Sequence, residues 1–262
     1  MKQIISSDNA LYKSLKALNS AKGRREQGLF LAEGPHLAEE ALRSRLPVRY
    51  VVTREKDCDR YAALLRQGES TGAELITLPA KLFDGLADTS TPQGILAVCG
   101  IQWHNLDAAA LSGARLAVVL DCVQDPGNLG TILRTALAVD AGFAVLTSDS
   151  TDPWSQKAVR ASQGAVLHLP VMECGQAADA IRALNAAGWH TACGHLDGSD
   201  FFKREQNDRT ALVIGNEAAG VSPEAAEACA SRWKLPMPGR AESLNAAVAA
   251  GVMLYDLWRE QN

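Results

Sequence analysis

Short runs of apolar residues recur along the second half of this chain, and each is followed by a loop rich in glycine, asparagine or proline. The runs at 116–120 and 211–214 contain no polar side chain. A strand of this kind is buried on both faces, as in a parallel sheet that helices cover from both sides. The pattern predicts an α/β domain with a mainly parallel sheet, whose further strands we expect at 143–146, 166–169, 189–192 and 232–235.

The first half repeats this alternation in a smaller set of elements. Strands that alternate with helices there predict a small α/β sandwich. Residues 102–108 have the composition of a linker, so the sequence predicts two domains, residues 1–107 and residues 108–262. In the first domain we expect strands at 29–32, 48–53, 74–78 and 94–101, with helices at 36–45, 61–66 and 81–87 between them.

Composition limits the class of protein. With 262 residues, of which 47% are hydrophobic, the chain can bury two modest cores. No apolar run approaches the ~18 residues that a bilayer-spanning helix needs, and the N-terminus lacks the apolar core of a signal peptide. We therefore expect a soluble, cytoplasmic protein with no membrane partner.

The cysteines, histidines and glycines give little sign of a metal or nucleotide site. The six cysteines include no pair at two-residue spacing, and the five histidines show no metal-binding spacing, so we expect reduced thiols and no metal. Cys193 and His195 come nearest to a ligand set, and we interpret them as a buried thiol beside a surface histidine. The loop glycines complete neither the Walker sequence nor the pattern Gly-x-Gly-x-x-Gly, which leaves sites for nucleoside triphosphates or NAD weakly supported.

The charge is distributed unevenly. The net charge is −4, yet residues 1–54 carry ten Lys and Arg against five Asp and Glu, which is +5. A basic segment on an acidic protein suggests a polyanionic partner such as RNA, and the alternative is a solvated helix face. The candidate RNA-binding residues, expected on a first helix and the loop at 21–25 that follows it, are Lys13, Lys16, Lys22, Arg24 and Arg25.

Three loops of the second half carry polar residues suited to a binding site. The first leads into a helix with Asn128 at its start and Arg134 about two turns further on. The second holds Gly215 and Glu217, and the third reaches Ser243, where we expect the last helix to begin with the hydroxyl capping its first turn. Parallel strands end at one edge of a sheet, and such domains bind ligands there, so the three loops predict one site.

In order and spacing, these loops resemble the three motifs of the SpoU/TrmH family of RNA 2′-O-ribose methyltransferases, within the SPOUT class. The segments at 30–42 and 91–98 are similar to the ribosomal-protein-like RNA-binding domain that precedes the catalytic domain in many members. The matching residues are Asn128, Gly130, Arg134 and Ala136 in the first motif, Gly215, Glu217 and Gly220 in the second, and Leu235, Gly239, Ser243 and Asn245 in the third.

The resemblance implies a trefoil knot in the C-terminal part of the second domain, S-adenosylmethionine bound in that knot, and a homodimer whose sites both subunits complete. The small apolar residues at 246–254 are the helix face we expect to pair in that dimer. By carry-over, the cofactor would be held at Gly215, Leu235, Ser243 and Leu244, and the methyl group and ribose would be surrounded by Asn128, Arg134, Glu217, Ser243 and Asn245.

These expectations combine into one predicted function. We expect an S-adenosylmethionine-dependent methyltransferase that acts on a ribose 2′-hydroxyl in structured RNA, and the two-domain layout favours rRNA over tRNA by analogy with the family. Two alternatives stay open. One is a tRNA ribose methyltransferase, which shares every motif, and the other is a non-catalytic RNA-binding protein that retains the fold.

Overall fold

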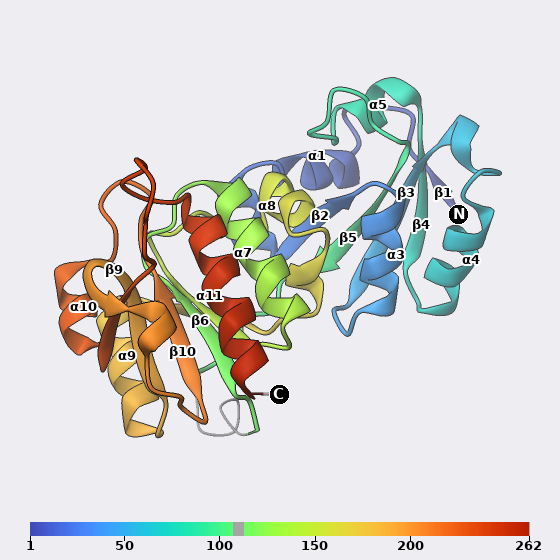
Figure 1. Cartoon of the computed structure of the whole chain (residues 1–262). Helices are drawn as coiled ribbons and strands as arrows, with labels where there is room; N and C mark the ends of the chain where they lie inside the picture. The colour runs from blue at the N-terminus through green and yellow to red at the C-terminus, as the bar shows by residue number, and fades with distance from the viewer. Residues whose placement is uncertain (107–112, 262) are drawn as a thin grey trace. The chain divides into compact units, whose positions relative to one another are not determined.

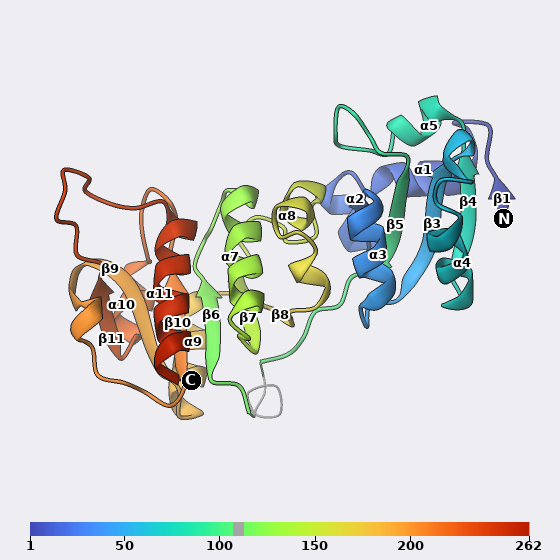
Figure 2. The same cartoon turned by 45° about the vertical axis from the view of Figure 1, so that its right-hand side comes forward.

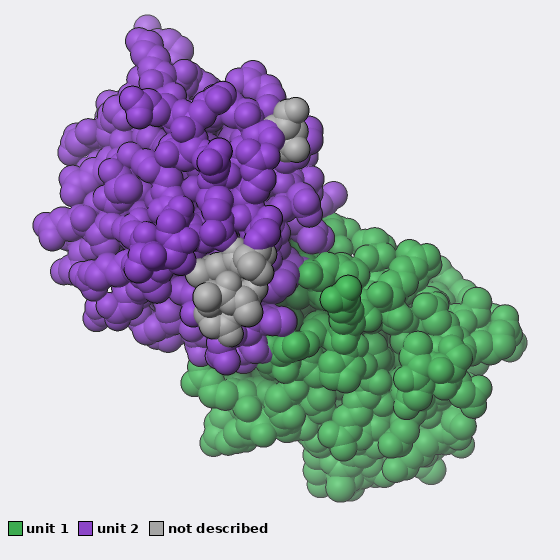
Figure 3. Space-filling model, turned by 90° about the horizontal axis from the view of Figure 1, so that it is seen from below, with its two compact units in different colours: residues 1–102, 152–168 green, residues 103–151, 169–262 purple. Residues whose placement is uncertain are grey.

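The computed structural model describes residues 1–106 and 113–261, and the chain divides into two compact units. Figure 3 colours them separately. The first unit comprises residues 1–102 and 152–168, and the second comprises residues 103–151 and 169–262. The predicted domain boundary between residues 107 and 108 lies outside the described residues.

The first unit is built on a mixed five-stranded sheet with the order β1-β4-β3-β5-β2. Strand β5 pairs antiparallel with both β2 and β3, whereas β3 and β1 pair parallel with β4. The short edge strand β1 was not predicted, because its two residues are exposed and show no apolar pattern. The strands are β1 (Lys2–Gln3), β2 (Leu29–Glu33), β3 (Val48–Arg54), β4 (Glu74–Leu78) and β5 (Ile95–Gly100).

Six α-helices accompany this sheet in the described part of the first unit (Figures 1 and 2). The predicted loop at 21–25 is wrong, since these residues form the helix α2. Ser20 caps α2 by accepting a hydrogen bond of 3.1 Å from the Gly23 N–H, and Gly28 ends it with φ of 63°. The helices are α1 (Ala10–Ala17), α2 (Ala21–Gln27), α3 (Pro35–Arg43), α4 (Ala62–Ser70), α5 (Ala80–Asp84) and α8 (Gln156–Ala161), with 3₁₀ turns at Glu55–Asp57 and Ala165–Leu167.

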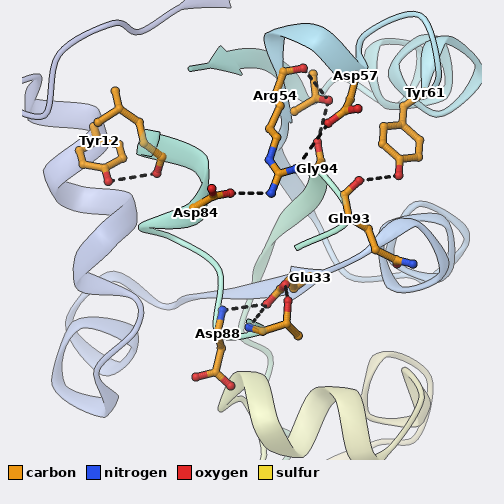
Figure 4. Close-up of polar contacts among 12 residues, drawn as sticks. Tyr12, Glu33, Arg54, Asp57, Tyr61, Asp84, Asp88, Gln93 and Gly94 are labelled. Carbon is orange, nitrogen blue, oxygen red and sulfur yellow. Dashed lines mark hydrogen bonds and ion pairs between the residues drawn. The ribbon is translucent and has the colours of Figure 1, made fainter. Parts of the chain in front are cut away.

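Polar contacts fasten the loop that connects α5 to β5 (Figure 4). The buried carboxylate of Glu33 accepts a hydrogen bond of 2.9 Å from the Asp88 N–H and a second from the Thr89 N–H at 3.3 Å. At the other end of the loop, the Tyr61 hydroxyl donates to the Gln93 carbonyl at 2.7 Å. The loop is therefore held by β2 on one side and by the start of α4 on the other.

Residues 152–168 pack into the first unit although they lie within the second half of the sequence. The ring of Trp154 lies 4.9 Å from that of Phe30 on β2, and Gln156 donates to the Leu86 carbonyl at 3.1 Å. On α8, Arg160 pairs with Asp88 at 2.5 Å. Trp154 and Gln156 are buried, and they make the segment part of the core of the first unit.

The second unit is built on a fully parallel six-stranded sheet with the order β11-β9-β10-β6-β7-β8. The predicted strand at 166–169 is wrong, because Gly164 begins a 3₁₀ turn at 165–167 with φ of 85°, and the strand starts only after Pro170. The strands are β6 (Leu116–Leu120), β7 (Phe143–Thr147), β8 (Val171–Cys174), β9 (His190–Asp200), β10 (Thr210–Ile214) and β11 (Ser231–Lys234).

Helices cover both faces of this sheet (Figures 1 and 2). Val119 on β6 and Val213 on β10 belong to one apolar cluster with Ile181 and Leu184 on α9. The alternate residues of β6 and β10 are also buried, and α11 contacts both strands and packs along α7 on that face. The helices are α7 (Pro126–Ala138), α9 (Ala177–Ala186), α10 (Pro223–Ala228) and α11 (Ala246–Gln261), with a 3₁₀ turn at Phe201–Lys203.

The buried guanidinium of Arg204 anchors the end of α11. It pairs with Asp256 at 3.0 Å and with Glu260 at 2.5 Å, and it lies over the ring of Phe201, 3.8 Å from the centroid. The last helix is thereby fixed against the sheet. Over residues 1–106 and 113–261, no helix is long and apolar enough to pass through a bilayer.

Candidate active site

Three loops meet above the carboxyl ends of β6 and β10, which are neighbours in the sheet. The N–H of Asp121, the first residue after β6, donates to the carbonyl of Ile214, the last residue of β10, at 2.8 Å. The buried carboxylate of Asp121 in turn accepts from the Ser222 N–H at 2.7 Å. The loops that follow the two strands are thus joined where they begin.

Glu217 is the centre of the polar contacts between these loops. Its carboxylate accepts hydrogen bonds from the N–H groups of Gln124 at 3.1 Å and Asp125 at 3.0 Å, and from Nδ2 of Asn128 at 2.9 Å. The largest single influence on Glu217 is burial, which opposes ionisation, but the hydrogen bonds together outweigh it and hold the pKa of this carboxyl below its usual value. Glu217 is therefore ionised at neutral pH, and it acts as a hydrogen-bond acceptor.

Asn245 connects the third loop to the first two. Its Nδ2 donates to Oδ1 of Asn128 at 2.9 Å, while its own Oδ1 accepts from the N–H groups of Ala247 and Val248. Asn245 is therefore the residue that caps α11, and the expectation that the helix begins at Ser243 is wrong. The side chains of Glu217, Asn128 and Asn245 form one continuous chain of hydrogen bonds, which we call the polar triad.

Asn216 was missed at the sequence level, and it shapes the second loop. Its Oδ1 accepts from the N–H groups of Ala218 and Ala219 at 3.0 Å each, and its Nδ2 donates to the Cys122 carbonyl at 2.9 Å. Asparagine directly after Gly215 was a usable signal, because an Asn side chain often closes a turn onto the backbone that follows it.

A cavity of about 440 Å³ lies beside the polar triad, between the middle of β9, the ends of β10 and β11 and the start of α11. All four residues predicted to hold a cofactor line it, namely Gly215, Leu235, Ser243 and Leu244. A Cβ on Gly215 would lie 2.2 Å from the Gly220 backbone, so only glycine fits at this position. The volume of the cavity lies within the range of about 300–1,000 Å³ that is usual for small-molecule sites.

Arg134 lies apart from the polar triad. It is exposed on α7, six residues beyond Asn128, and within the described chain its guanidinium has neither a hydrogen bond nor an ion pair. A planar fork of donors is thus left free to bind a ligand from outside this chain. In the same described ranges, no group of three or more His, Cys, Asp or Glu side chains could hold a metal ion.

Four of the five candidate RNA-binding residues are exposed on α1 and α2. They are Lys13, Lys16, Lys22 and Arg25.

Arg24 is an exception, because its side chain is buried and only 5% of the residue is exposed. Its Nη2 pairs with Asp152 at 2.6 Å and its Nη1 donates to the Leu18 carbonyl at 2.8 Å. These bonds occupy its guanidinium inside the first unit, so Arg24 is not on the surface with the other four residues.

Comparisons with known proteins match two separate stretches of the sequence. A model of the SpoU rRNA methylase family matches residues 115–255, and a model of the MRM3-like substrate-binding domain matches residues 9–97. The chain belongs to the SpoU rRNA methylase family. The MRM3-like match covers most of the part of the first unit that precedes residue 102.

Relatives of the SpoU family match over nearly the whole chain. The 23S rRNA (guanosine(2553)-2′-O)-methyltransferase RlmP of Bacillus subtilis is 36% identical, over 98% of this chain and 99% of its own. An AdoMet-bound rRNA methyltransferase from Sinorhizobium meliloti has a TM-score of 0.89 at 31% identity, covering 100% of this chain and 98% of that one. The AdoMet complex of the SpoU methyltransferase AviRb from Streptomyces viridochromogenes has a TM-score of 0.86 at 29% identity, with coverage of 97% and 98%.

Proposed function

We propose that this protein transfers a methyl group from S-adenosylmethionine to a ribose 2′-hydroxyl of ribosomal RNA. The observation that carries the proposal is the polar triad of Glu217, Asn128 and Asn245, which joins all three motif loops at the rim of one cavity. Two relatives of matching length support the substrate class, one named a 23S rRNA 2′-O-methyltransferase and the other an rRNA methyltransferase.

The cavity suits the cofactor in size and in lining. Its walls combine apolar side chains such as Ile214, Val221 and Leu244 with loop backbone at Gly215, so an adenine ring could be buried while main-chain groups bind its edge. S-adenosylmethionine supplies an activated methyl group when it is bound. Gly215, Leu235, Ser243 and Leu244 are the residues we assign to holding it.

The polar triad fixes the geometry around the reacting groups. Because three hydrogen bonds stabilise the ionised form of Glu217 and lower its pKa, it is a poor acceptor for the proton of the ribose hydroxyl. Its role is to hold Asn128 and the first loop rigid. Asn128 and Asn245 then define where the ribose can approach the cavity.

Arg134 is the residue that we assign to the RNA. Its guanidinium has hydrogen-bond donors and no acceptor, so it does not take the proton, but it can bind a phosphate through two parallel hydrogen bonds. Such binding would hold the ribose hydroxyl in line with the methyl group, and RNA phosphate or water would receive the proton. Positioning is thus the larger part of catalysis in this proposal.

The first unit delivers the RNA in this proposal. The match to a substrate-binding domain supports this role, as do the exposed cations Lys13, Lys16, Lys22 and Arg25 on adjacent helices. Cations on one face attract the phosphate backbone without reading its sequence. The location we propose is the cytoplasm, which agrees with the rRNA methyltransferase relatives.

We further propose that two copies pair through α11 and that the C-terminal segment is knotted. Val248, Val252, Tyr255 and Trp258 follow one another at helical spacing, and each is 40–52% exposed. Large apolar side chains in a continuous stripe favour burial against a partner. A second copy is the occupant that the family resemblance supports.

Mapping of 2′-O-methyl groups tests the function. Purified protein is incubated with labelled S-adenosylmethionine and either total rRNA or total tRNA. We expect label in rRNA, at one ribose, and none with Asn128→Ala/Glu217→Ala. Label in tRNA alone would show that the substrate is tRNA and not rRNA. Binding of RNA without label in either pool would show that the protein is a non-catalytic RNA-binding protein.

A further inference from the structure

His195 lies in the wall of the cavity, in the stretch of β9 between the paired residues Cys193 and Ser199. Cys193 is the last β9 residue paired with β10, and Gly194, His195 and Asp197 line the cavity. The sequence predicted a surface histidine, whereas this residue is half-buried. Its Nδ1 accepts a hydrogen bond of 3.1 Å from the Asp197 N–H. This bond closes a turn over residues 195–197 and fixes the ring against it.

This hydrogen bond determines which ring nitrogen carries the proton. A neutral imidazole has one donor and one acceptor nitrogen, and Nδ1 is the acceptor here. The proton of the neutral ring is therefore on Nε2. Nε2 has no hydrogen-bond partner in the part of the chain that the structure describes, so the wall of the cavity contains an unused donor.

The strand order indicates which part of the cofactor would meet that donor. Glu217 follows β10 and bonds to the loop after β6, whereas His195 belongs to β9, on the other side of β10. In the proposed function the transferred methyl group lies near the polar triad, so another part of the cofactor lies over β9. Asp197 and Glu242 also line the cavity, and these two carboxylates disfavour the methionyl carboxylate of the cofactor beside them.

We propose that His195 binds the adenosyl part of S-adenosylmethionine by donating a hydrogen bond from Nε2 to one of its acceptor atoms. The adenosyl part is uncharged and rich in acceptors, unlike the methionyl carboxylate. This inference rests on the proposed function. His195 is then a cofactor-positioning residue that none of the three motifs contains.

Two isosteric substitutions separate this role from a role in the turn. In His195→Gln the side-chain amide can place its NH₂ group near the position of Nε2, so the donor is kept and the acceptor for Asp197 is lost. In His195→Asn the amide oxygen can replace Nδ1, so the turn is kept and the donor is lost. His36→Asn, an exposed histidine of the first unit, is the control.

Calorimetry on the full chain measures the effect without turnover. The ligands are S-adenosylhomocysteine and 5′-methylthioadenosine, which lacks the amino-acid tail. We expect His195→Asn to weaken both ligands about five- to tenfold, as one lost hydrogen bond does, and His195→Gln to remain within about twofold of the unmodified protein.

The other outcomes overturn the proposal. If His195→Gln lowers the affinity for the ligands and His195→Asn does not, the residue acts through the turn. Equal losses of affinity in both variants would lead to the same conclusion. A loss restricted to S-adenosylhomocysteine would place Nε2 at the amino-acid tail. Unchanged affinity in both variants would remove His195 from recognition, whereas failure of the unmodified protein to bind either ligand would refute the proposed cofactor itself.

Discussion

At the scale of single residues, the site depends on asparagine and glutamate side chains that use every hydrogen-bonding group they have. Asn245 caps a helix with its oxygen and binds Asn128 with its nitrogen. Asn128 then donates to Glu217, which also holds the N–H groups at the start of α7. In such a chain, replacing one member leaves its partners unsatisfied, so the effects of substitutions will not be additive.

Arg134→Lys tests whether a planar fork is needed at this position. Lysine keeps the charge but cannot bind a phosphate through two parallel bonds, so we expect single-turnover methylation to fall about a hundredfold or more, nearly as far as in Arg134→Ala. Affinity for S-adenosylhomocysteine should not change. Arg182→Lys on α9 is the control, and a rate in Arg134→Lys close to that of the control would exclude the fork.

Glu217 makes stability depend on pH in acid. Its pKa is depressed in the folded protein, so its contribution to the free energy of unfolding is complete above the ordinary value of 4.5 and disappears as the pH falls through the lower folded value. Urea unfolding from pH 6 downwards should show this loss, and Glu217→Gln should show less of it. Glu227→Gln, an exposed residue on α10, serves as the control, and identical pH profiles for the two variants would contradict the assignment.

Much of the candidate site was predictable because motif spacing records loop geometry. Gly215 and Glu217 follow a strand that is apolar throughout, and this pattern is enough to place them at its carboxyl end. What the sequence could not supply were the side-chain choices. Ser243 and Asn245 are both good caps, and only the contact with Asn128 shows which of them begins α11. Likewise, nothing in the spacing separates the buried Arg24 from the exposed Arg25.

At the scale of elements, the helix pair α1 and α2 presents exposed cations over a buried anchor. Arg24 points inward to Asp152, and this directs its neighbour Arg25 and Lys22, two residues earlier in sequence, to the surface. The same short helix thus contributes a buried ion pair and part of a charged face.

Charge reversal on α2 should weaken RNA binding. In Lys22→Glu/Arg25→Glu we expect the dependence of RNA affinity on salt to become shallower, because fewer counterions are released, while cofactor affinity is unchanged. Filter binding between about 50 and 200 mM salt measures the slope. Lys56→Glu/Arg66→Glu changes the charge equally elsewhere in the unit. An equal effect of this control on the salt dependence would show that RNA binding is not specific to α2.

The exposed stripe on α11 leads to a prediction about assembly. We expect Val252→Glu/Tyr255→Glu to convert a dimer to a monomer, because both charges would lie in the apolar interface. Sedimentation velocity at micromolar concentration reports the mass. Glu227→Lys on α10 is the charge-changing control. A monomer in the unmodified protein would refute pairing through this helix.

At the scale of the whole molecule, the strands of both sheets were mostly predictable, but the membership of one segment was not. The interval between β7 and β8 reads as an ordinary connection within a parallel sheet, but it contributes Trp154 and Gln156 to the core of the first unit. Hydrophobic periodicity shows that a residue is buried and not which core it enters.

Trp154→Ala should therefore destabilise the first unit and spare the second. The side chain is 2% exposed and packs on Phe30, so we expect a loss of roughly 3–5 kcal/mol. Hydrogen exchange should speed up in β2 and remain slow in β6 and β10. Trp154→Phe, which retains an aromatic ring, should show a smaller change, and faster exchange confined to β10 would contradict the assignment.

The packing of residues 152–168 into the first unit also constrains how proteins of this architecture can be inherited. Because each unit consists of two stretches of chain, no single contiguous piece of the gene encodes the whole of either one. A recombination event near residue 107 would join the front of one protein's first unit to another protein's Asp152, Trp154 and Arg160. The graft would succeed only where Arg24, Phe30 and Glu33 happen to match them, so the two halves of the gene are expected to descend together.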